Sequence, residues 1–139
     1  MPVKSSNTEV CTFPLKKKYI LTHEEYHRDI EILAGMLVGQ KFTGIAPIVR
    51  GGLGIALRLS HLLGIHGFAF RAEQIKGGRW LIIDDVSDTG KTLVKYTSQI
   101  EKGEFVVATL YRKDHTVFEP NYYVRTINNW IVFPYEKTS

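Results

Sequence analysis

The stretch WLIIDDVSDTGKTL, from Trp80 to Leu93, decides the fold of this 139-residue chain. Its apolar first half, up to Ile83, is typical of a buried strand, and the small residues after Asp88 are typical of a tight loop that opens a helix. Three aspartates lie between the two halves. A loop that served only solubility would not need its residues in this order. Because α/β proteins bind ligands beyond the carboxyl ends of their strands, this junction is the first candidate for chemistry.

The rest of the chain predicts strands that alternate with helices. Besides the quoted one, the predicted strands lie near Tyr19 and at 45–49, 66–71, 104–111 and 122–127. Thr22 and Glu25 predict a capping box before a helix with one apolar face, a second helix ends at Gly64, and a third spans about 92–101. Continuous apolar runs in this arrangement predict an α/β fold with an open, mostly parallel, twisted sheet flanked by helices.

Composition limits the class of protein. With 139 residues, 44% of them hydrophobic, the chain is expected to form a single domain over 18–139 after an N-terminal arm at 1–17. The longest mostly apolar run, 53–65, is too short and too polar to span a bilayer. No signal-peptide pattern and a lone Cys11 predict a cytoplasmic protein without disulfides or membrane contact. A net charge of +4 suits an anionic ligand, but the lysine run at 16–18 supports nucleic-acid binding only weakly.

The segment Thr89-Gly90-Lys91-Thr92 predicts an anion site. It is not a P-loop, because that motif needs a glycine five positions before Gly90, where the chain has Asp85. At a helix N-terminus, however, free N–H groups, the helix dipole, two hydroxyls and an ammonium all favour a phosphate. A plain helix cap is the alternative for this segment on its own.

The aspartates before this loop favour a ligand over a plain cap. Adjacent carboxylates at the end of an apolar strand repel each other and are costly to desolvate without a cation or hydroxyl partners. Side chains alternate along a strand, so we expect Asp84 and Asp85 to have different surroundings, one of them a sugar diol or Mg²⁺. Asp88 lies one loop turn further on, where it can accept a proton.

A second anion site is predicted at the glycines after strand 45–49. Gly51 and Gly52 permit positive φ and close approach of the backbone, and Arg50 adds a planar donor fork suited to phosphate or pyrophosphate. Two anion-binding loops at neighbouring strand ends, with acids between them, predict a ligand that carries two phosphate groups on a sugar.

These motifs resemble those of a known family. LIIDDVSDTGKTL closely resembles the phosphoribosyl pyrophosphate signature of type I phosphoribosyltransferases, and IVRGGLGIALRLSHLLGI resembles their pyrophosphate loop and first core helix. The ending NNWIVFPYE resembles the base-binding segment of bacterial xanthine-guanine and related 6-oxopurine phosphoribosyltransferases. The likeness covers about 18–136, and it implies the type I fold with a small, reduced hood and a homo-oligomer, either a dimer or a tetramer.

The resemblance implies roles for the sugar and phosphate residues. The residues that match the positions for phosphoribosyl pyrophosphate are Val49, Arg50, Gly51, Gly52, Asp84, Asp85, Thr89, Gly90, Lys91 and Thr92. The segment from Val49 to Gly51 would bind the pyrophosphate, and the segment from Thr89 to Thr92 the 5′-phosphate. Asp84 and Asp85 would serve the ribose hydroxyls and Mg²⁺.

The resemblance also implies the residues that meet the base. Asp88 would accept the proton near purine N7, and Lys113 would donate to the 6-oxo group. Trp130 would stack on the purine, with the backbone of Ile131 near its C2 edge. Glu136, as a further metal residue, stands where the family usually has an aspartate.

The implied reaction is purine salvage: a purine ring nitrogen displaces pyrophosphate from C1 of the sugar and yields a nucleoside 5′-monophosphate. Mg²⁺ is the implied cofactor, and a purine base and phosphoribosyl pyrophosphate are the implied substrates. Two alternatives stay open. One is a regulatory protein that senses phosphoribosyl pyrophosphate or a nucleotide and binds RNA, and the other is a pyrimidine phosphoribosyltransferase. Lys113 and Trp130 favour a purine, but guanine, hypoxanthine and xanthine are not separated by the sequence.

The segment FRAEQIKGGRW departs from the family pattern, in which a longer mobile loop covers the reacting centre. Only about eight residues, 72–79, separate the two predicted strands here. Extended, they span at most about 26 to 29 Å, of which about 16 Å is needed to return along a five-residue strand. Little chain is left for a lid, and we expect poor closure from this connection.

Overall fold

The structure is a computed structural model that describes residues 17–136. In chain order its elements are β1 (Lys18–Ile20), α1 (His23–Leu37), β2 (Gly44–Pro47), α2 (Leu53–Leu63), the 3₁₀ turn η1 (Ala72–Gln74), β3 (Lys76–Ser87), α3 (Lys91–Ser98), β4 (Lys102–Arg112), β5 (Tyr122–Thr126) and β6 (Trp130–Val132). The predicted N-terminal arm lies outside the described residues, except for Lys17.

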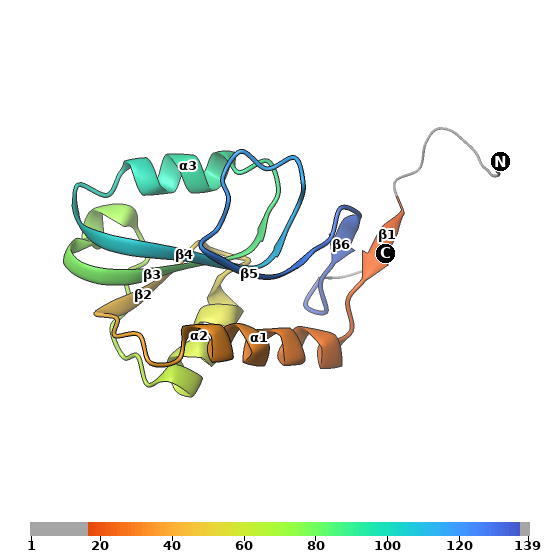
Figure 1. Cartoon of the computed structure of the whole chain (residues 1–139), viewed down its shortest axis with the longest axis horizontal. Helices are drawn as coiled ribbons and strands as arrows, with labels where there is room; N and C mark the ends of the chain where they lie inside the picture. Colours follow the sequence, from red (N-terminus) through yellow and green to blue (C-terminus); the bar gives the residue numbers. More distant parts are fainter. Residues whose placement is uncertain (1–16, 137–139) are drawn as a thin grey trace.

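The main sheet has four strands in the order β2-β3-β4-β5, and all neighbouring pairs are parallel. Helices α1 and α2 lie on one face of this sheet and α3 lies on the other (Figure 1). Strands β1 and β6 form a separate two-stranded parallel sheet, which is the predicted reduced hood. The open parallel α/β fold predicted from the sequence is therefore confirmed.

Strand β3 shows why its apolar run is continuous. Leu81 and Ile83 belong to the core cluster that includes residues of α1 and α2, such as Leu33. Trp80 and Ile82 belong to the cluster on the other face of the sheet, together with residues of α3. A strand with helices over both faces buries every side chain, so apolar residues follow one another without polar alternation.

Two helix ends follow the predicted chemistry. The backbone N–H of Glu25 donates to the Thr22 hydroxyl at 3.0 Å, and the N–H of Thr22 donates to the Glu25 carboxylate at 3.2 Å, which completes the capping box of α1. Helix α2 ends at Gly64, whose φ of 70° is the left-handed conformation that glycine adopts without steric cost.

The prediction of a strand over 66–71 is wrong. Phe68 makes only an isolated bridge to Ile45 of β2, and the Ile45 N–H donates to the Gly67 carbonyl at 2.8 Å. The residues predicted as loop are instead the turn η1 and the first residues of β3, where Lys76 pairs with Lys102. With β3 beginning so early, too little chain remains for a full strand and its return.

Other predicted boundaries also shift. The strand predicted at 45–49 is β2, which ends at Pro47. Strand β3 continues past Ile83 to Ser87, because its last residues keep pairing with β4, as in the pair of Ser87 with Arg112. Helix α3 stops at Ser98 rather than near 101, since β4 begins at Lys102. Asp84 and Asp85 therefore lie within the strand, whereas Asp88 is the first residue after it.

A buried polar network joins the hood to the main sheet. The Asp29 carboxylate, whose residue is 4% exposed, accepts from Tyr111 Oη at 2.6 Å and from Arg125 Nη2 at 2.7 Å. Arg125 Nη1 also donates to the hydroxyl of Tyr19 in β1 at 3.1 Å. Buried charges are stable only when paired in this way, so the network fixes β1 against α1, β4 and β5.

Within residues 17–136, none of the helices has both the length and the apolar character needed to cross a membrane.

Candidate functional site

Four cavities open near the carboxyl ends of the strands. The TGKT cavity, of about 70 Å³, is lined by Asp84, Val86, Ser87, Asp88, Thr89, Gly90, Thr92 and Leu93. The Trp130 cavity, of about 160 Å³, is lined by Asp85, Val86, Asp88, Lys113, Trp130, Ile131, Phe133 and Glu136. The Arg50 cavity, of about 710 Å³, is lined by Arg50, Gly51, Asp85, Tyr135 and Glu136. The outer cavity, of about 490 Å³, is lined by Lys17, Asp88, Lys113, His115, Asn128, Asn129 and Trp130.

Two aspartates connect these spaces. Asp88 lines the TGKT, Trp130 and outer cavities, and Asp85 lines the Trp130 and Arg50 cavities. A molecule that lies along these two carboxylates can therefore reach all four spaces at once.

The TGKT loop needs glycine at position 90. Gly90 has a φ of 87°, and a Cβ there would lie 2.6 Å from both the backbone nitrogen of Phe118 and the hydroxyl oxygen of Thr116. The loop is held against the β4–β5 connection, because the Val117 N–H donates to the Thr89 carbonyl at 2.9 Å. The start of α3 is thereby fixed with its first N–H groups beside the cavity, as the sequence predicts. The side chain of Lys91 is exposed and is not among the residues that line the cavity.

Asp84 and Asp85 have different surroundings, as strand alternation predicts. Asp84 lines the TGKT cavity, whereas Asp85 lines the two cavities nearer to Gly51 and Trp130. Each carboxylate also accepts the N–H of the next residue, at 2.9 Å for Asp84 and 2.7 Å for Asp85. Burial, together with the charge of Asp85, raises the pKa of Asp84 well above the usual range of a carboxyl group. Partners that favour the charged form are thus needed for both acids to be ionised.

The loop after β2 is pressed against β3. A side chain at Gly51 would overlap the Asp85 carboxylate, and one at Gly52 would overlap the Ile83 carbonyl oxygen. The Val49–Arg50 peptide bond is cis, and both residues are exposed. The predicted close approach of the backbone is present, and it brings the Arg50 loop to one of the two connecting aspartates.

Lys113 is buried and not an exposed loop lysine. Its residue is 6% exposed, and its Nζ donates to the carbonyl oxygens of Ile127 at 3.1 Å and Asn129 at 2.5 Å. Both carbonyls lie just before β6, so Lys113 ties the end of β4 to the segment that carries Trp130. The ammonium also faces the Trp130 and outer cavities.

Trp130 is 53% exposed, which shows that it is not a core residue. Its ring and the buried Ile131 line the same cavity as Asp88. Glu136 lines this cavity too, and its carboxylate accepts the Phe133 N–H at 2.9 Å. The predicted base residues are thus brought together around one space.

Sequence reasoning missed Tyr135 and His115. Tyr135 Oη donates to Asp85 Oδ2 at 2.9 Å, and its pKa is raised by burial and by the nearby charge of Asp85. His115 Nε2 lies 2.8 Å from Asp88 Oδ1. The only available signal was proximity in sequence, since Tyr135 precedes Glu136 and His115 follows Lys113 by two positions.

The donor set suits Mg²⁺ that arrives with its substrate. Among the described residues, there is no group of three or more His, Cys, Asp or Glu side chains that could hold a metal alone. Asp85 and Glu136 line the Arg50 cavity together, whereas Asp84 lines a different one. One or two carboxylates completed by substrate phosphates are the usual Mg²⁺ site in enzymes of phosphorylated substrates.

Comparison with known proteins identifies the family. Residues 67–137 match the model of the phosphoribosyl transferase domain. The xanthine-guanine phosphoribosyltransferase of Desulfotalea psychrophila is 30% identical over 145 residues, covering 89% of each chain. This chain belongs to the phosphoribosyl transferase family. It is therefore an enzyme of the phosphoribosyltransferase class, and the matched region contains the TGKT loop, Lys113 and Trp130.

Solved phosphoribosyltransferases have the same architecture. The purine phosphoribosyltransferase of Pyrococcus horikoshii Ot3 is 34% identical, with a TM-score of 0.75 over 88% of this chain and 95% of that one. A xanthine-guanine-hypoxanthine phosphoribosyltransferase of Helicobacter pylori superposes with a TM-score of 0.74 over 86% and 92% of the two chains, although only 14% of its residues are identical. The second likeness shows the shared fold alone.

Proposed function

We propose that this enzyme makes a purine nucleoside 5′-monophosphate and pyrophosphate from phosphoribosyl pyrophosphate and a 6-oxopurine, namely guanine, hypoxanthine or xanthine. The observation that carries the proposal is the line of cavities joined by Asp85 and Asp88. It offers a phosphate loop, a carboxylate pair and an aromatic platform in the order in which a nucleotide presents phosphate, sugar and base. The similar proteins are named as phosphoribosyltransferases of purines, which favours this function over the pyrimidine and regulatory alternatives. We assign the reaction to purine salvage in the cytoplasm.

The sugar phosphate is bound from two loops. The N–H groups and hydroxyls of Thr89–Thr92 bind the 5′-phosphate at the start of α3. The backbone of Val49–Gly51, with Gly52 and the Arg50 guanidinium, binds the pyrophosphate from the other side of Asp85. Asp84 and Asp85 accept hydrogen bonds from the two ribose hydroxyls, and such donors stabilise the ionised form of Asp84, which burial disfavours in the free site because it raises the pKa of that carboxyl group.

A bound Mg²⁺ would neutralise negative charge on the leaving pyrophosphate. We propose that Asp85 and Glu136, which both line the Arg50 cavity, would hold the ion there together with the substrate phosphates. Glutamate is one methylene longer than the aspartate expected from the resemblance, and here its carboxylate bonds the Phe133 N–H. Asp84 completes the proposed set from the neighbouring cavity.

The base is bound in the Trp130 cavity. Trp130 stacks on the purine, the Ile131 backbone meets the C2 edge, and Lys113 donates to the 6-oxo group. The ring nitrogen attacks C1 while the C1–O bond to pyrophosphate breaks, and Asp88 accepts the proton that the purine loses. Positive charge develops on the sugar in the transition state, so the carboxylates beside it lower the barrier.

A panel of bases tests this function. Each base is mixed with phosphoribosyl pyrophosphate, Mg²⁺ and the full chain, and nucleotide formation is followed by chromatography. Nucleotides formed from at least one 6-oxopurine, and none from uracil or orotate, are expected. A preference for a pyrimidine, or no product from any base, would contradict the proposal.

Trp130→Ala is expected to weaken purine binding by about 1 to 3 kcal/mol, the usual loss when an aromatic platform under a base is removed. Affinity for phosphoribosyl pyrophosphate should stay within twofold of the wild-type value, about 0.4 kcal/mol, since the phosphate loops do not touch Trp130. Because the side chain is half exposed, the thermal midpoint should hardly move. Titration calorimetry with each substrate checks this, and Trp80→Ala serves as a contrast, since that tryptophan is buried and should lower the midpoint instead. Unfolding of the Trp130 variant would show a core role.

The site is expected to leak phosphoribosyl pyrophosphate to water. In the connection from α2 to β3, the Gly67 carbonyl and the Ala69 N–H form hydrogen bonds with the backbone of Ile45, near the start of β2. The connection is thus held away from the carboxyl ends of the strands, so we do not expect it to close over Asp88. Water then competes with the purine at C1. Pyrophosphate release should therefore be measurable without any purine. Fast release that depends strictly on purine would contradict this expectation.

We further propose that the enzyme is a homo-oligomer, a dimer or a tetramer. Large apolar side chains are exposed on both helices of one face, Ile32 and Met36 on α1 and Leu57 and Leu62 on α2. Exposed apolar surface of this kind can mark a site where another protein chain binds. Light scattering of the purified chain measures the number of copies, and a monomer would contradict the proposal.

A further inference from the structure

A pair of titratable side chains connects the site to solvent. His115 Nε2 and Asp88 Oδ1 are 2.8 Å apart, and the side chains are 62% and 44% exposed. Both line the outer cavity. One face of the Asp88 carboxyl therefore meets the Trp130 cavity and the other meets an imidazole that reaches water.

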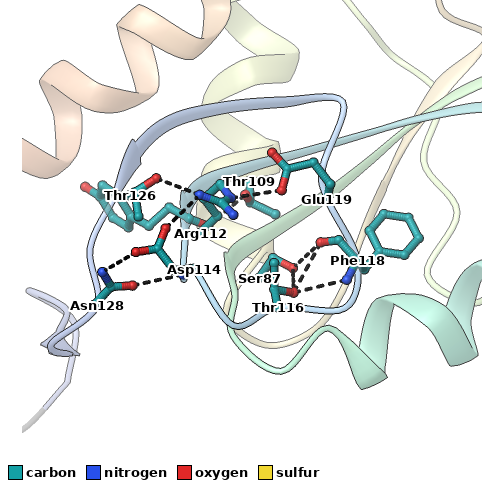
Figure 2. A network of polar contacts seen from close by, with 10 residues as sticks. Ser87, Thr109, Arg112, Asp114, Thr116, Phe118, Glu119, Thr126 and Asn128 are labelled. Atoms are coloured by element: carbon teal, nitrogen blue, oxygen red, sulfur yellow. Dashed lines mark hydrogen bonds and ion pairs between the residues drawn. The ribbon is translucent and has the colours of Figure 1, made fainter.

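The chain on either side of His115 is anchored (Figure 2). On one side, the Asp114 N–H donates to Asn128 Oδ1 at 2.9 Å, and Asn128 Nδ2 donates back to the Asp114 carboxylate at 2.8 Å. On the other side, the hydroxyls of Thr116 and Ser87 share a hydrogen bond of 2.8 Å. Ser87 directly precedes the proposed proton acceptor, so one network fixes the backbone of both partners.

Arg112 adds rigidity to the same loop. Its guanidinium bonds Asp114 at 3.3 Å, Glu119 at 3.0 Å and Thr126 at 3.0 Å, which ties the β4–β5 connection to β5 (Figure 2). The Asp114 carboxylate accepts hydrogen bonds from Arg112 and Asn128, and neither of these bonds involves His115. A side chain held at both flanks reaches its partner with little loss of conformational entropy.

Charged side chains from several elements surround the pair. Among the described residues that line the outer cavity, Asp88 is the one carboxylate, whereas Lys17 and Lys113 bring positive charge from the start of the chain and the end of β4. Asn128 and Asn129, which carry no charge, also line this cavity. On the inner side, Asp85 and Glu136 line the Trp130 cavity together with Asp88, and Asp84 lines the TGKT cavity with it, so these three carboxylates are the like charges near the pair.

We propose that His115 is a positioning residue that orients Asp88 and passes the purine proton to solvent, an inference that rests on the proposed function. The purine N7–H bond breaks and the proton goes to the Asp88 carboxylate. The Asp88 O–H then gives the proton to Nε2 of the neutral imidazole, and the resulting imidazolium releases the Nδ1 proton to water. One proton leaves the purine, one reaches solvent, and Asp88 returns to its ionised form.

His115→Gln tests the inference, with His66→Gln as the matched control on an exposed histidine far from the site. We expect kcat to fall about 10-fold or more, as for residues that orient a functional group, with little change in KM for phosphoribosyl pyrophosphate. The dependence of kcat on pH between about 5.5 and 7.5, the range in which histidine titrates, should flatten. Added imidazole should restore part of kcat in His115→Ala.

A double-mutant cycle separates the inference from the function itself. In an Asp88→Asn background, His115→Gln should cause no further loss, because the group it acts through is absent. An equal loss in both backgrounds, or an unchanged kcat and pH profile in an active enzyme, would overturn the inference and leave the function intact. A wild-type enzyme that converts none of the 6-oxopurines would overturn both.

Discussion

Asp88→Asn is expected to lower kcat by about 100-fold or more, the usual scale for the loss of a group that accepts a proton. The substitution keeps the size of the side chain and a hydrogen-bonding oxygen for His115, so the cavities should keep their shape. It removes the negative charge that we propose takes up the purine proton, on a residue that lines the TGKT, Trp130 and outer cavities.

Steady-state kinetics with saturating substrates measures this effect, and calorimetry measures binding separately. Affinities for phosphoribosyl pyrophosphate and for the purine should stay close to the wild-type values. Glu31→Gln, which removes an exposed carboxylate on α1, is the control for a charge change outside the site. Unchanged turnover in the Asp88 variant would remove Asp88 from the mechanism.

Asp85→Ala is expected to weaken binding of phosphoribosyl pyrophosphate by about 100-fold. The carboxylate lines both the Arg50 and Trp130 cavities, and its loss removes a charge-assisted hydrogen bond to the sugar that is worth up to about 3 kcal/mol. It also removes the acid that we place beside Mg²⁺, so the affinity should become less sensitive to the metal.

Tyr135→Phe separates this role from local packing, because it deletes only the hydroxyl that donates to Asp85 at 2.9 Å. That variant should lose far less affinity than Asp85→Ala and should keep the dependence on Mg²⁺. Calorimetric titrations with and without Mg²⁺ give both quantities. Wild-type affinity in Asp85→Ala would show that the diol and metal roles belong elsewhere.

Sequence reasoning succeeded where structure is decided locally. The turn at Thr89–Thr92 needs a glycine in the left-handed conformation and free N–H groups at a helix start, and consecutive residues of the sequence supply both. The continuous apolar run of β3 predicted a strand buried on both faces for the same reason. By contrast, the apolar residues at 66–71 match a strand pattern but form only an isolated bridge. A full strand there would also need enough residues before β3 for the chain to return along the sheet, and a local pattern does not reveal where β3 begins.

The parts of the site that sequence did not reveal are contacts between distant residues. His115 meets Asp88 across 27 positions, and Tyr135 meets Asp85 across 50. The buried partner of Arg125 is Asp29, 96 positions away. None of these residues is unusual in its own neighbourhood, so only the folded chain shows that Lys113 is buried and that His115 contacts Asp88.

The pairing of β1 with β6 also bears on the order in which the enzyme becomes competent. Lys18 pairs with Trp130, so the platform for the base joins the two ends of the described chain, whereas both phosphate loops lie between residues 49 and 92. Contacts so distant in sequence close long loops of chain, and a two-stranded sheet of three residues per strand contributes little stability of its own. We therefore expect β1 and β6 to separate more readily than the strands of the main sheet. A chain opened in this way would keep the two proposed phosphate loops while the proposed base platform is displaced, so purine binding should be lost before phosphate binding.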